Sequence, residues 1–285
     1  MEKKLYKNFL QQNGYCLIKN FFNIDEVEKL RKFVVKNYNN NQDIYLSNND
    51  SALDTNLLSK RYFQILKETI GNDLVYFLDS STFVDNIQKN TGIFHIDARG
   101  DEKDPDSTIY KVWRVGVYLQ DHKNNSGGIK MIAKSHKKFL CNSIKKIYYI
   151  LRKFFKNNYS LKSLIPSFKY VNISSEPGDL IIWNGRTHHC GRFKRLKKFK
   201  DLTFHPFIER HLPNFLIKNE ITDRLVVFQN WGLKDLTVTE YLKYRLSQKS
   251  DEKYWQNNNN NKGKFPFDIF EENSIKIIDD SNINS

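Results

Sequence analysis

Two short stretches of this 285-residue chain contain side chains that could bind one metal ion. The stretch "FHIDARG" contains His95 and Asp97, and a later stretch contains the adjacent histidines His188 and His189. Residues i and i+2 of a β-strand project from the same face, so His95 and Asp97 can reach the same ion. Two imidazoles and one carboxylate form the 2-His-1-carboxylate site of non-haem iron proteins, which leaves open positions on the metal. These residue types therefore favour a metal site that can also bind a cosubstrate and oxygen.

The His-x-Asp spacing alone does not indicate a metal site, because it also arises by chance. With 7 histidines and 32 acidic residues, about one His-x-acid sequence is expected by chance. Considered alone, His95 also fits a half-buried strand histidine. Strand alternation does not decide between His188 and His189, because Gly185 just before them can carry a β-bulge.

The elements that must position these residues are mainly β-strands. From residue 73 onward, short segments rich in β-branched and aromatic residues are separated by Gly, Asn, Asp and Pro. Seven or more such strands in one region favour a β-sandwich or barrel over alternating β-α units. The predicted strands are "DLVYFLDSSTFVDNIQ", "GIFHID", "YKVWRVGVYLQDH", "GGIKMIA", "YVNIS", "GDLIIWN" and "RLVVFQNWG". Helices are predicted at residues 2–12, 23–38, 55–69, 137–156 and 237–248.

The order of the motifs resembles a known family. After "FHIDARG" come a long strand, "NNSGGIKMIAKSHK", "EPGDLIIWNGRTHHCG" and a strand that opens on arginine, "DRLVVFQNWG". This order resembles the phytanoyl-CoA dioxygenase family of iron(II)- and 2-oxoglutarate-dependent oxygenases, over roughly residues 8 to 248. The resemblance implies a mainly β fold with flanking helices and a double-stranded β-helix core, also called a jelly roll or cupin-like fold.

The resemblance also sets the expected domain organisation. Residues 1–248 are predicted to form one oxygenase domain, with a helical part at 1–70, a jelly-roll core at about 73–232 and the C-terminal helix at 237–248. Residues 249–285 contain "NNNNNKGK" and are predicted to be a low-complexity, largely disordered tail, in which "FPFDIF" can dock back.

The resemblance further implies which residues hold the cofactors. The family pattern Arg-Thr-x-His-x-Gly matches "RTHHCG" with His189 as the metal ligand, so His95, Asp97 and His189 are expected to hold Fe(II). The far carboxylate of 2-oxoglutarate needs a cation, and a guanidinium can bind it through two parallel hydrogen bonds. Arg224 opens the last strand and is the expected anchor. It stands 35 residues after His189, a longer spacing than the family usually has, so Lys200 is a rival and residues 193–220 are expected to loop out.

The charge of the chain bears on its partners. The formal net charge is +14, and residues 122–175 contain twelve Lys or Arg and no acidic residue. An electropositive entrance would favour an anionic substrate, although a lysine-rich composition explains the bulk charge equally well. The segment 137–156 is basic and amphipathic, and fits a lid, weak contact with a membrane surface, or packing on the barrel. No motif for sequence-specific recognition of nucleic acid is present.

Cysteine usage and hydropathy bear on the compartment. The three cysteines form no CxxC pair, the N-terminal residues contain no apolar signal-peptide core, and no apolar run approaches a membrane span. These features predict a cytoplasmic protein without a transmembrane segment.

The predicted function is that of an Fe(II)/2-oxoglutarate-dependent dioxygenase. It would use O₂ to hydroxylate a small organic substrate, such as a lipid or acyl compound, a saccharide precursor or another metabolite, and would convert 2-oxoglutarate to succinate and CO₂. Two alternatives remain open from the sequence. One is a catalytically inactive jelly-roll protein that binds a metabolite, and the other is a basic protein that binds nucleic acid or anionic membranes. The sequence does not indicate an oligomeric state.

Overall fold

Two β-sheets that face each other form the core of the fold. In the computed structural model, the larger sheet has the strand order β1-β7-β4-β9-β2-β10, with β3 also paired to β9, and the smaller sheet has the order β6-β5-β8. Side chains from both sheets meet in one buried cluster, which includes Tyr118 and Trp183 from the larger sheet and Ile129 from the smaller one. All the described strand pairs are antiparallel except that of β10 with β2, and two facing, mainly antiparallel sheets are the arrangement of a jelly roll. The predicted fold class is confirmed.

The structure describes residues 2–39, 57–77, 81–85, 92, 94–98, 110–137, 170–199, 202, 204–219, 224–247 and 267–278. The strands of the larger sheet are β1 (Tyr15–Ile18), β2 (Leu74–Phe77), β3 (Ser81–Asp85), β4 (Val112–Tyr118), β7 (Leu180–Asn184), β9 (Arg224–Leu233) and β10 (Lys276–Ile278). Those of the smaller sheet are β5 (Ile129–Met131), β6 (Val171–Ile173) and β8 (His189–Gly191). The predicted strand "GIFHID" is reduced to an isolated bridge between His95 and His189, which lies beside β8.

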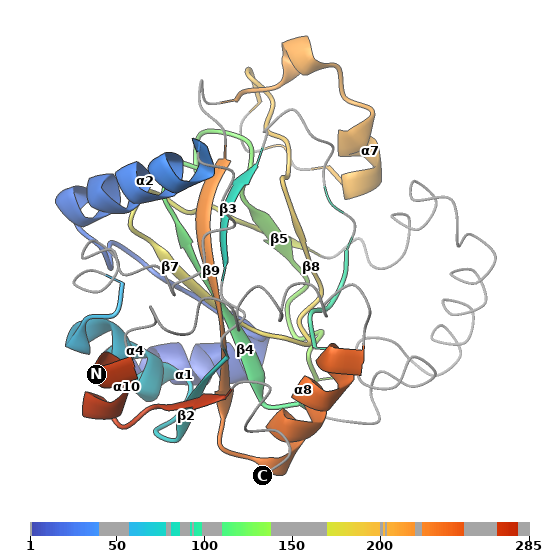
Figure 1. Cartoon of the computed structure of the whole chain (residues 1–285). Coiled ribbons are helices and arrows are strands. Elements are labelled where there is room, and N and C mark those ends of the chain that lie inside the picture. The colour runs from blue at the N-terminus through green and yellow to red at the C-terminus, as the bar shows by residue number, and fades with distance from the viewer. Residues whose placement is uncertain are drawn as a thin grey trace, which may run out of the picture.

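Helices cover the outer face of the larger sheet. The described helices are α1 (Glu2–Asn13), α2 (Ile24–Asn39), α4 (Lys60–Thr69), α7 (Pro206–Arg210), α8 (Leu236–Ser247) and α10 (Phe267–Glu272), with a 3-10 turn η1 (Asn214–Leu216). In Figure 1, α1, α2, α4 and α10 gather on the left, beside the larger sheet, while α7 lies outside the smaller sheet. The predicted helix at 137–156 lies outside the described residues except for its first residue.

Local sequence explains where two of these helices begin. The Asn23 side chain accepts a hydrogen bond from the backbone N–H of Glu26 (2.9 Å), and the Glu26 carboxylate accepts one from the N–H of Asn23 (2.8 Å). This reciprocal pair is a capping box, which fixes the start of α2 at the predicted position. The helix predicted at 55–69 is shorter, because Ser59 caps it and α4 begins at Lys60.

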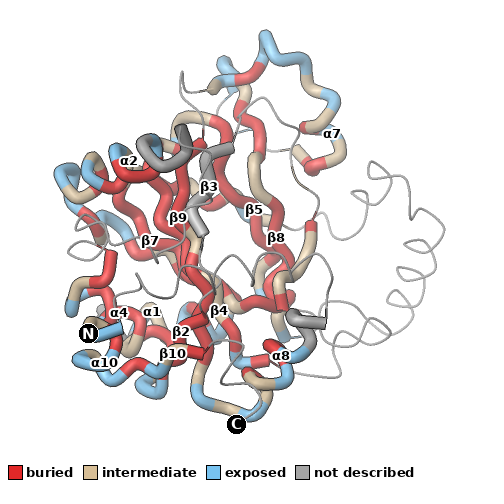
Figure 2. Tube along the Cα trace, viewed as in Figure 1, coloured by how far each residue is buried: buried red, intermediate tan, exposed pale blue. Residues whose placement is uncertain are grey.

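Strand alternation gives the larger sheet two different apolar faces. Val115 and Val117 of β4 point outward and pack with Leu30 of α2 and Leu66 of α4. The alternating residues Arg114, Gly116 and Tyr118 point to the inside of the barrel, where Tyr118 packs with the smaller sheet. Figure 2 shows that the buried residues follow the strands and that exposure concentrates on the outer sides of the helices. The interior face of β4 therefore lies toward the candidate site.

Part of the C-terminal tail belongs to the fold. Residues 267–278 form α10 and β10, and β10 pairs in parallel with β2. Phe270 is fully buried among the aromatic rings of Phe63, Tyr76 and Trp231. The aromatic cluster gives "FPFDIF" the buried docking position that the sequence allowed, and the ordered part of the tail extends further, to residue 278. Within the part of the chain that the structure describes, no helix combines the length and the hydropathy that crossing a membrane would require.

The residues between β8 and β9, here called the insertion (residues 193–219), fold back onto the barrel. Leu196 and Ile217 form a bridge that closes its base. Glu209 of α7 reaches Lys130 of β5, and both side chains are fully buried. The insertion therefore packs against the smaller sheet, whereas the sequence predicted only that it would loop out.

Candidate metal centre and cosubstrate pocket

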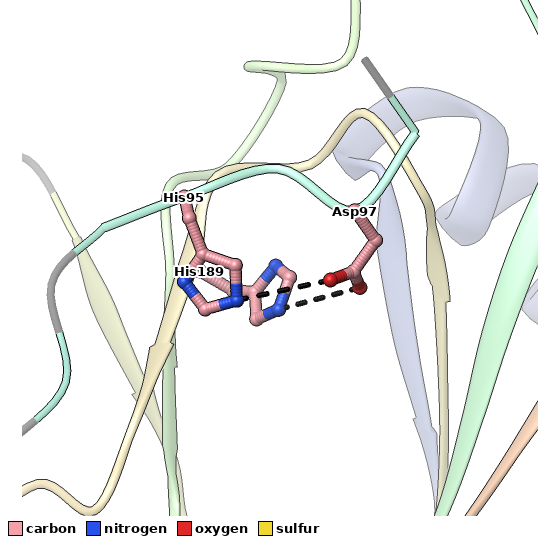
Figure 3. Close-up of side chains that lie close together, drawn as sticks. All are labelled: His95, Asp97 and His189. Atoms are coloured by element: carbon pink, nitrogen blue, oxygen red, sulfur yellow. Dashed lines mark ion pairs between the residues drawn. The ribbon is translucent and has the colours of Figure 1, made fainter. Parts of the chain in front are cut away.

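His95, Asp97 and His189 converge at one point beside the smaller sheet. Each offers a ligand atom, and these atoms all lie within 4.8 Å of one another. Nε2 of His95 lies 3.7 Å from Oδ1 of Asp97, and Nε2 of His189 lies 3.4 Å from Oδ2. Figure 3 shows both imidazoles and the carboxylate directed toward each other. The predicted proximity is therefore observed, and the role of these residues as metal ligands remains a prediction.

The backbone fixes this convergence. His95 and His189 exchange both backbone hydrogen bonds, each of 2.9 Å, so they stand directly opposite each other and their side chains share a face. The backbone N–H groups of Asp97 and Ala98 both donate to the carbonyl of Gly185 (2.8 and 2.9 Å). A Cβ atom at Gly185 would lie only 2.7 Å from the Cβ of Ala98. Glycine is required at position 185 because the segment that carries Asp97 approaches it so closely.

The hydrogen bond of His189 defines which of its nitrogens carries the proton. Nδ1 lies 2.9 Å from the carbonyl of Thr187, and because a carbonyl only accepts, Nδ1 must donate. Burial, only partly opposed by the charge of Asp97, lowers the pKa of His189 to about 4, so the ring is neutral near pH 7. Its Nε2 is then a lone-pair acceptor that faces another acceptor, Oδ2 of Asp97. Two buried acceptors in contact are unfavourable unless a cation lies between them.

Asp97 is held by two side chains that sequence reasoning did not single out. Trp183 donates from Nε1 to Oδ2 (3.3 Å), and Nη1 of Arg114 lies 3.3 Å from Oδ1. Burial alone would raise the pKa of Asp97, but the nearby His189, Arg114 and His95, with the Trp183 hydrogen bond, outweigh it and lower the pKa. The carboxylate is therefore ionised and ready to bind a cation. Strand alternation in "KVWRVGVYLQDH" would have indicated Arg114, because it shares the inward face of Tyr118.

The centre is more accessible on the side of His95. The exposed fraction of the side chains is 5% for His189, 11% for Asp97 and 41% for His95.

Two other histidines lie near the centre but outside this cluster. His188 is buried, and its backbone N–H donates to the hydroxyl of Ser135 (2.9 Å). His136 contacts the carbonyl of Gln11 in α1 (3.1 Å), which is a structural contact.

Arg224 is buried close to the strand that carries His189. Its side chain begins β9 and is buried, and its Nη2 donates to the hydroxyl of Tyr118 (3.3 Å). A Cβ atom at Gly191 would lie 3.5 Å from Nη2, an ordinary van der Waals distance, so Gly191 of β8 is a direct neighbour of the guanidinium. Among the described residues, no carboxylate pairs with Arg224, and its buried Nε has no hydrogen-bond partner. Lys200, the rival anchor, lies outside the described residues.

His122 lies beside Arg224. Its Nδ1 lies 2.9 Å from the carbonyl of Ser126 and must donate to it, which leaves Nε2 as a buried acceptor without a partner among the described groups. Burial and the nearby Arg224 lower the pKa of His122 to about 3. The ring is therefore neutral, and Arg224 supplies the positive charge beside it.

Comparison with solved structures places this fold among known proteins. HygX from Streptomyces hygroscopicus, solved with nickel and 2-oxoglutarate bound, is similar with a TM-score of 0.53 and 15% identity, over 82% of this chain and 87% of that chain. The α-ketoglutarate-dependent epimerase SnoN from nogalamycin biosynthesis has a TM-score of 0.52 and 11% identity, over 81% and 80%. The carbocyclase SnoK has a TM-score of 0.51 and 12% identity, over 81% and 84%. At these identities the likeness shows the fold. A comparison with curated proteins finds no match.

The fold and the triad together define a class, the non-haem iron oxygenases with a jelly-roll core. Within this class, the sequence profile of the phytanoyl-CoA dioxygenase (PhyH) family matches residues 10–193, which is more than half of the chain. The chain belongs to the phytanoyl-CoA dioxygenase family. It is therefore an enzyme that depends on iron and 2-oxoglutarate, as the sequence predicted.

Proposed function

We propose that the enzyme hydroxylates a small organic substrate. One oxygen atom of O₂ enters a C–H bond of the substrate, and the other enters succinate, which forms with CO₂ from 2-oxoglutarate. The observation that carries this proposal is the buried contact between two acceptors, Nε2 of His189 and Oδ2 of Asp97. A divalent cation would relieve this contact, and the third side chain, His95, completes the 2-His-1-carboxylate set.

Each residue of the centre has a proposed role. His95, Asp97 and His189 hold Fe(II), which when bound supplies the activation of oxygen. The Thr187 carbonyl orients the His189 ring, and Trp183 orients Asp97, so the ligands are fixed before the metal binds.

Arg224 is the proposed anchor for the far carboxylate of 2-oxoglutarate. Its buried guanidinium has a donor without a partner among the described groups, and burying an uncompensated charge is costly, so an anionic ligand would stabilise it. The Tyr118 hydroxyl accepts a hydrogen bond from Arg224 and keeps its own proton, which it can donate to the same carboxylate.

The proposed substrate class is a small metabolite, with an anionic one favoured. The support is the net charge of +14 and the seven Lys or Arg between residues 186 and 200, of which Lys197 and Lys198 are exposed whereas Arg186, Lys194 and Arg195 are buried. Exposed cations raise the local concentration of anions around them.

Anaerobic addition of Fe(II) and 2-oxoglutarate tests this proposal. A bidentate 2-oxo acid on ferrous iron gives a visible charge-transfer band, which we expect in the native protein and in His188→Ala. The band should be absent from His189→Ala, because that variant loses a proposed metal ligand. His188→Ala is the matched control, because it replaces the adjacent histidine and leaves the ligands in place. Circular dichroism of each variant without metal checks that the fold is intact. A native protein that takes up iron but shows no band with 2-oxoglutarate would contradict the proposal and favour an inactive metabolite-binding protein.

The anchor is tested by a second pair of variants. Arg224→Ala should weaken the binding of 2-oxoglutarate by about tenfold or more, whereas Lys200→Ala should leave it near the native value. The opposite result would assign the anchor to Lys200.

A further inference from the structure

Arg114 is a second guanidinium inside the barrel, at the end of the site opposite to Arg224. It stands in β4, four residues before Tyr118, and its register partners are Trp183 in β7 and Asn230 in β9. Its Nη1 lies 3.3 Å from Oδ1 of Asp97, and its side chain is 21% exposed. Arg114 is therefore next to the metal-binding carboxylate and still partly accessible.

Both guanidiniums contact the same aromatic ring. The guanidinium carbon of Arg114 lies 5.3 Å from the centroid of Phe228, and that of Arg224 lies 5.9 Å from it. The two guanidinium carbons are thus at most about 11 Å apart, the sum of these distances. Both guanidiniums are therefore close enough for the two ends of one small dicarboxylate to reach them.

We propose that Arg114 binds the carboxylate at the metal end of the 2-oxo acid, while Arg224 binds the carboxylate at the far end. This inference rests on the proposed function, since it concerns the same cosubstrate. Arg114 then contacts both Asp97 and the carboxylate of the bound 2-oxo acid.

The positive charge of Arg114 should affect the affinities for the metal ion and for the 2-oxo acid in opposite directions. A cation beside Asp97 opposes the binding of a divalent metal ion but favours the binding of an anion. Replacing Arg114 with an uncharged residue should therefore leave metal affinity unchanged or increase it, and should weaken the affinity for the 2-oxo acid. A side chain that only kept Asp97 in place would show a different pattern, in which both affinities fall together.

Calorimetric titrations of native protein, Arg114→Gln and Arg114→Lys test the inference. Each protein is titrated with Mn(II) and then, in its Mn(II)-loaded form, with 2-oxoglutarate. For Arg114→Gln we expect a dissociation constant for Mn(II) within about threefold of native or tighter, and one for 2-oxoglutarate weakened by about tenfold or more. Arg114→Lys should recover part of the loss, because it restores the charge without the planar fork.

Arg61→Gln is the matched control. Arg61 also pairs with a carboxylate, that of Glu26 (2.8 Å), and also contacts an aromatic ring, that of Phe21 (4.8 Å), but it lies in α4 on the outer side of the larger sheet. Both affinities of this variant should equal those of the native protein.

A 2-oxo acid without the far carboxylate separates the two guanidiniums. For 2-oxovalerate, Arg114→Gln should still weaken binding, whereas Arg224→Ala should have little effect. Native affinity for 2-oxoglutarate in Arg114→Gln would overturn the inference, and so would a parallel loss of Mn(II) and 2-oxoglutarate binding. If the native protein itself failed to bind 2-oxoglutarate, the proposed function would be wrong, a result that is distinct from either of these.

Discussion

The buried ion pair between Lys130 and Glu209 gives the sharpest prediction about the fold around the site. Nζ of Lys130 lies 2.5 Å from Oε1 of Glu209, and neither side chain is exposed to solvent. Nζ also donates to the carbonyl of Phe204 and lies 4.6 Å from the ring centroid of Tyr170. Lys130 is the register partner of Cys190, the residue after His189. The pair therefore fastens the insertion to the sheet that carries a proposed metal ligand.

The magnitude follows from the cost of a lone buried charge. Burial lowers the pKa of Lys130 and raises that of Glu209, so each charge is unfavourable by itself and depends on its partner. Lys130→Met should lower the free energy of unfolding by about 3–5 kcal/mol, and Glu209→Leu should have a similar effect. The double variant should recover most of this loss, because an apolar pair of similar volume replaces the ion pair.

Urea unfolding of the native protein, the two single variants and the double variant measures this as a double-mutant cycle. Lys111→Met is the control: Lys111 lies 2.5 Å from Asp235, but it is 51% exposed, so its loss should change stability far less. Additive effects in the cycle, or a loss in Lys130→Met as small as that of the control, would refute the reasoning.

Two further predictions concern the protonation of His122 and the position of Asp97 against Gly185. The pKa of His122 is lowered from 6.5 to about 3, so the folded state resists a proton that the unfolded state accepts, and stability should fall as pH drops from 6.5 toward 3. At pH 5 this effect lowers the free energy of unfolding by about 2 kcal/mol relative to neutral pH. Chemical unfolding at several pH values should show that this fall is absent from His122→Gln but is the same as in the native protein for His211→Gln, which replaces an exposed histidine. Gly185→Ala should displace Asp97, because the added Cβ would lie 2.7 Å from that of Ala98; calorimetry should show weaker Mn(II) binding, and native affinity would contradict the close approach.

Local pattern predicted most of the strands and part of the site, and the resemblance predicted the rest of the site. The i, i+2 spacing of His95 and Asp97 placed both side chains on one face, and period-2 segments identified most strands. The capping residue Asn23 marked the start of α2 because a capping box is a local feature. The resemblance supplied His189, which strand alternation alone could not distinguish from its neighbour.

Long-range contacts explain what the sequence did not reveal. Lys130 and Glu209 are 79 residues apart, so nothing local indicates that the insertion packs against β5. The docking of residues 267–278 depends on Phe270 reaching a cluster built by α4, β2 and β9. Arg114 stood in a predicted strand. Its contact with Asp97 depends on the register of β4 with its neighbours and on the hydrogen bonds that hold the Asp97 backbone against Gly185.

X-ray absorption at the iron edge tests the central claim most directly, namely that two imidazoles and one carboxylate hold a single ferrous ion. The iron-loaded native protein and His188→Ala should both show scattering from two imidazole rings, with nitrogen and oxygen ligands at about 2 Å. His189→Ala should show one ring. A native spectrum without imidazole scattering, or a spectrum of His189→Ala identical to the native one, would contradict the account.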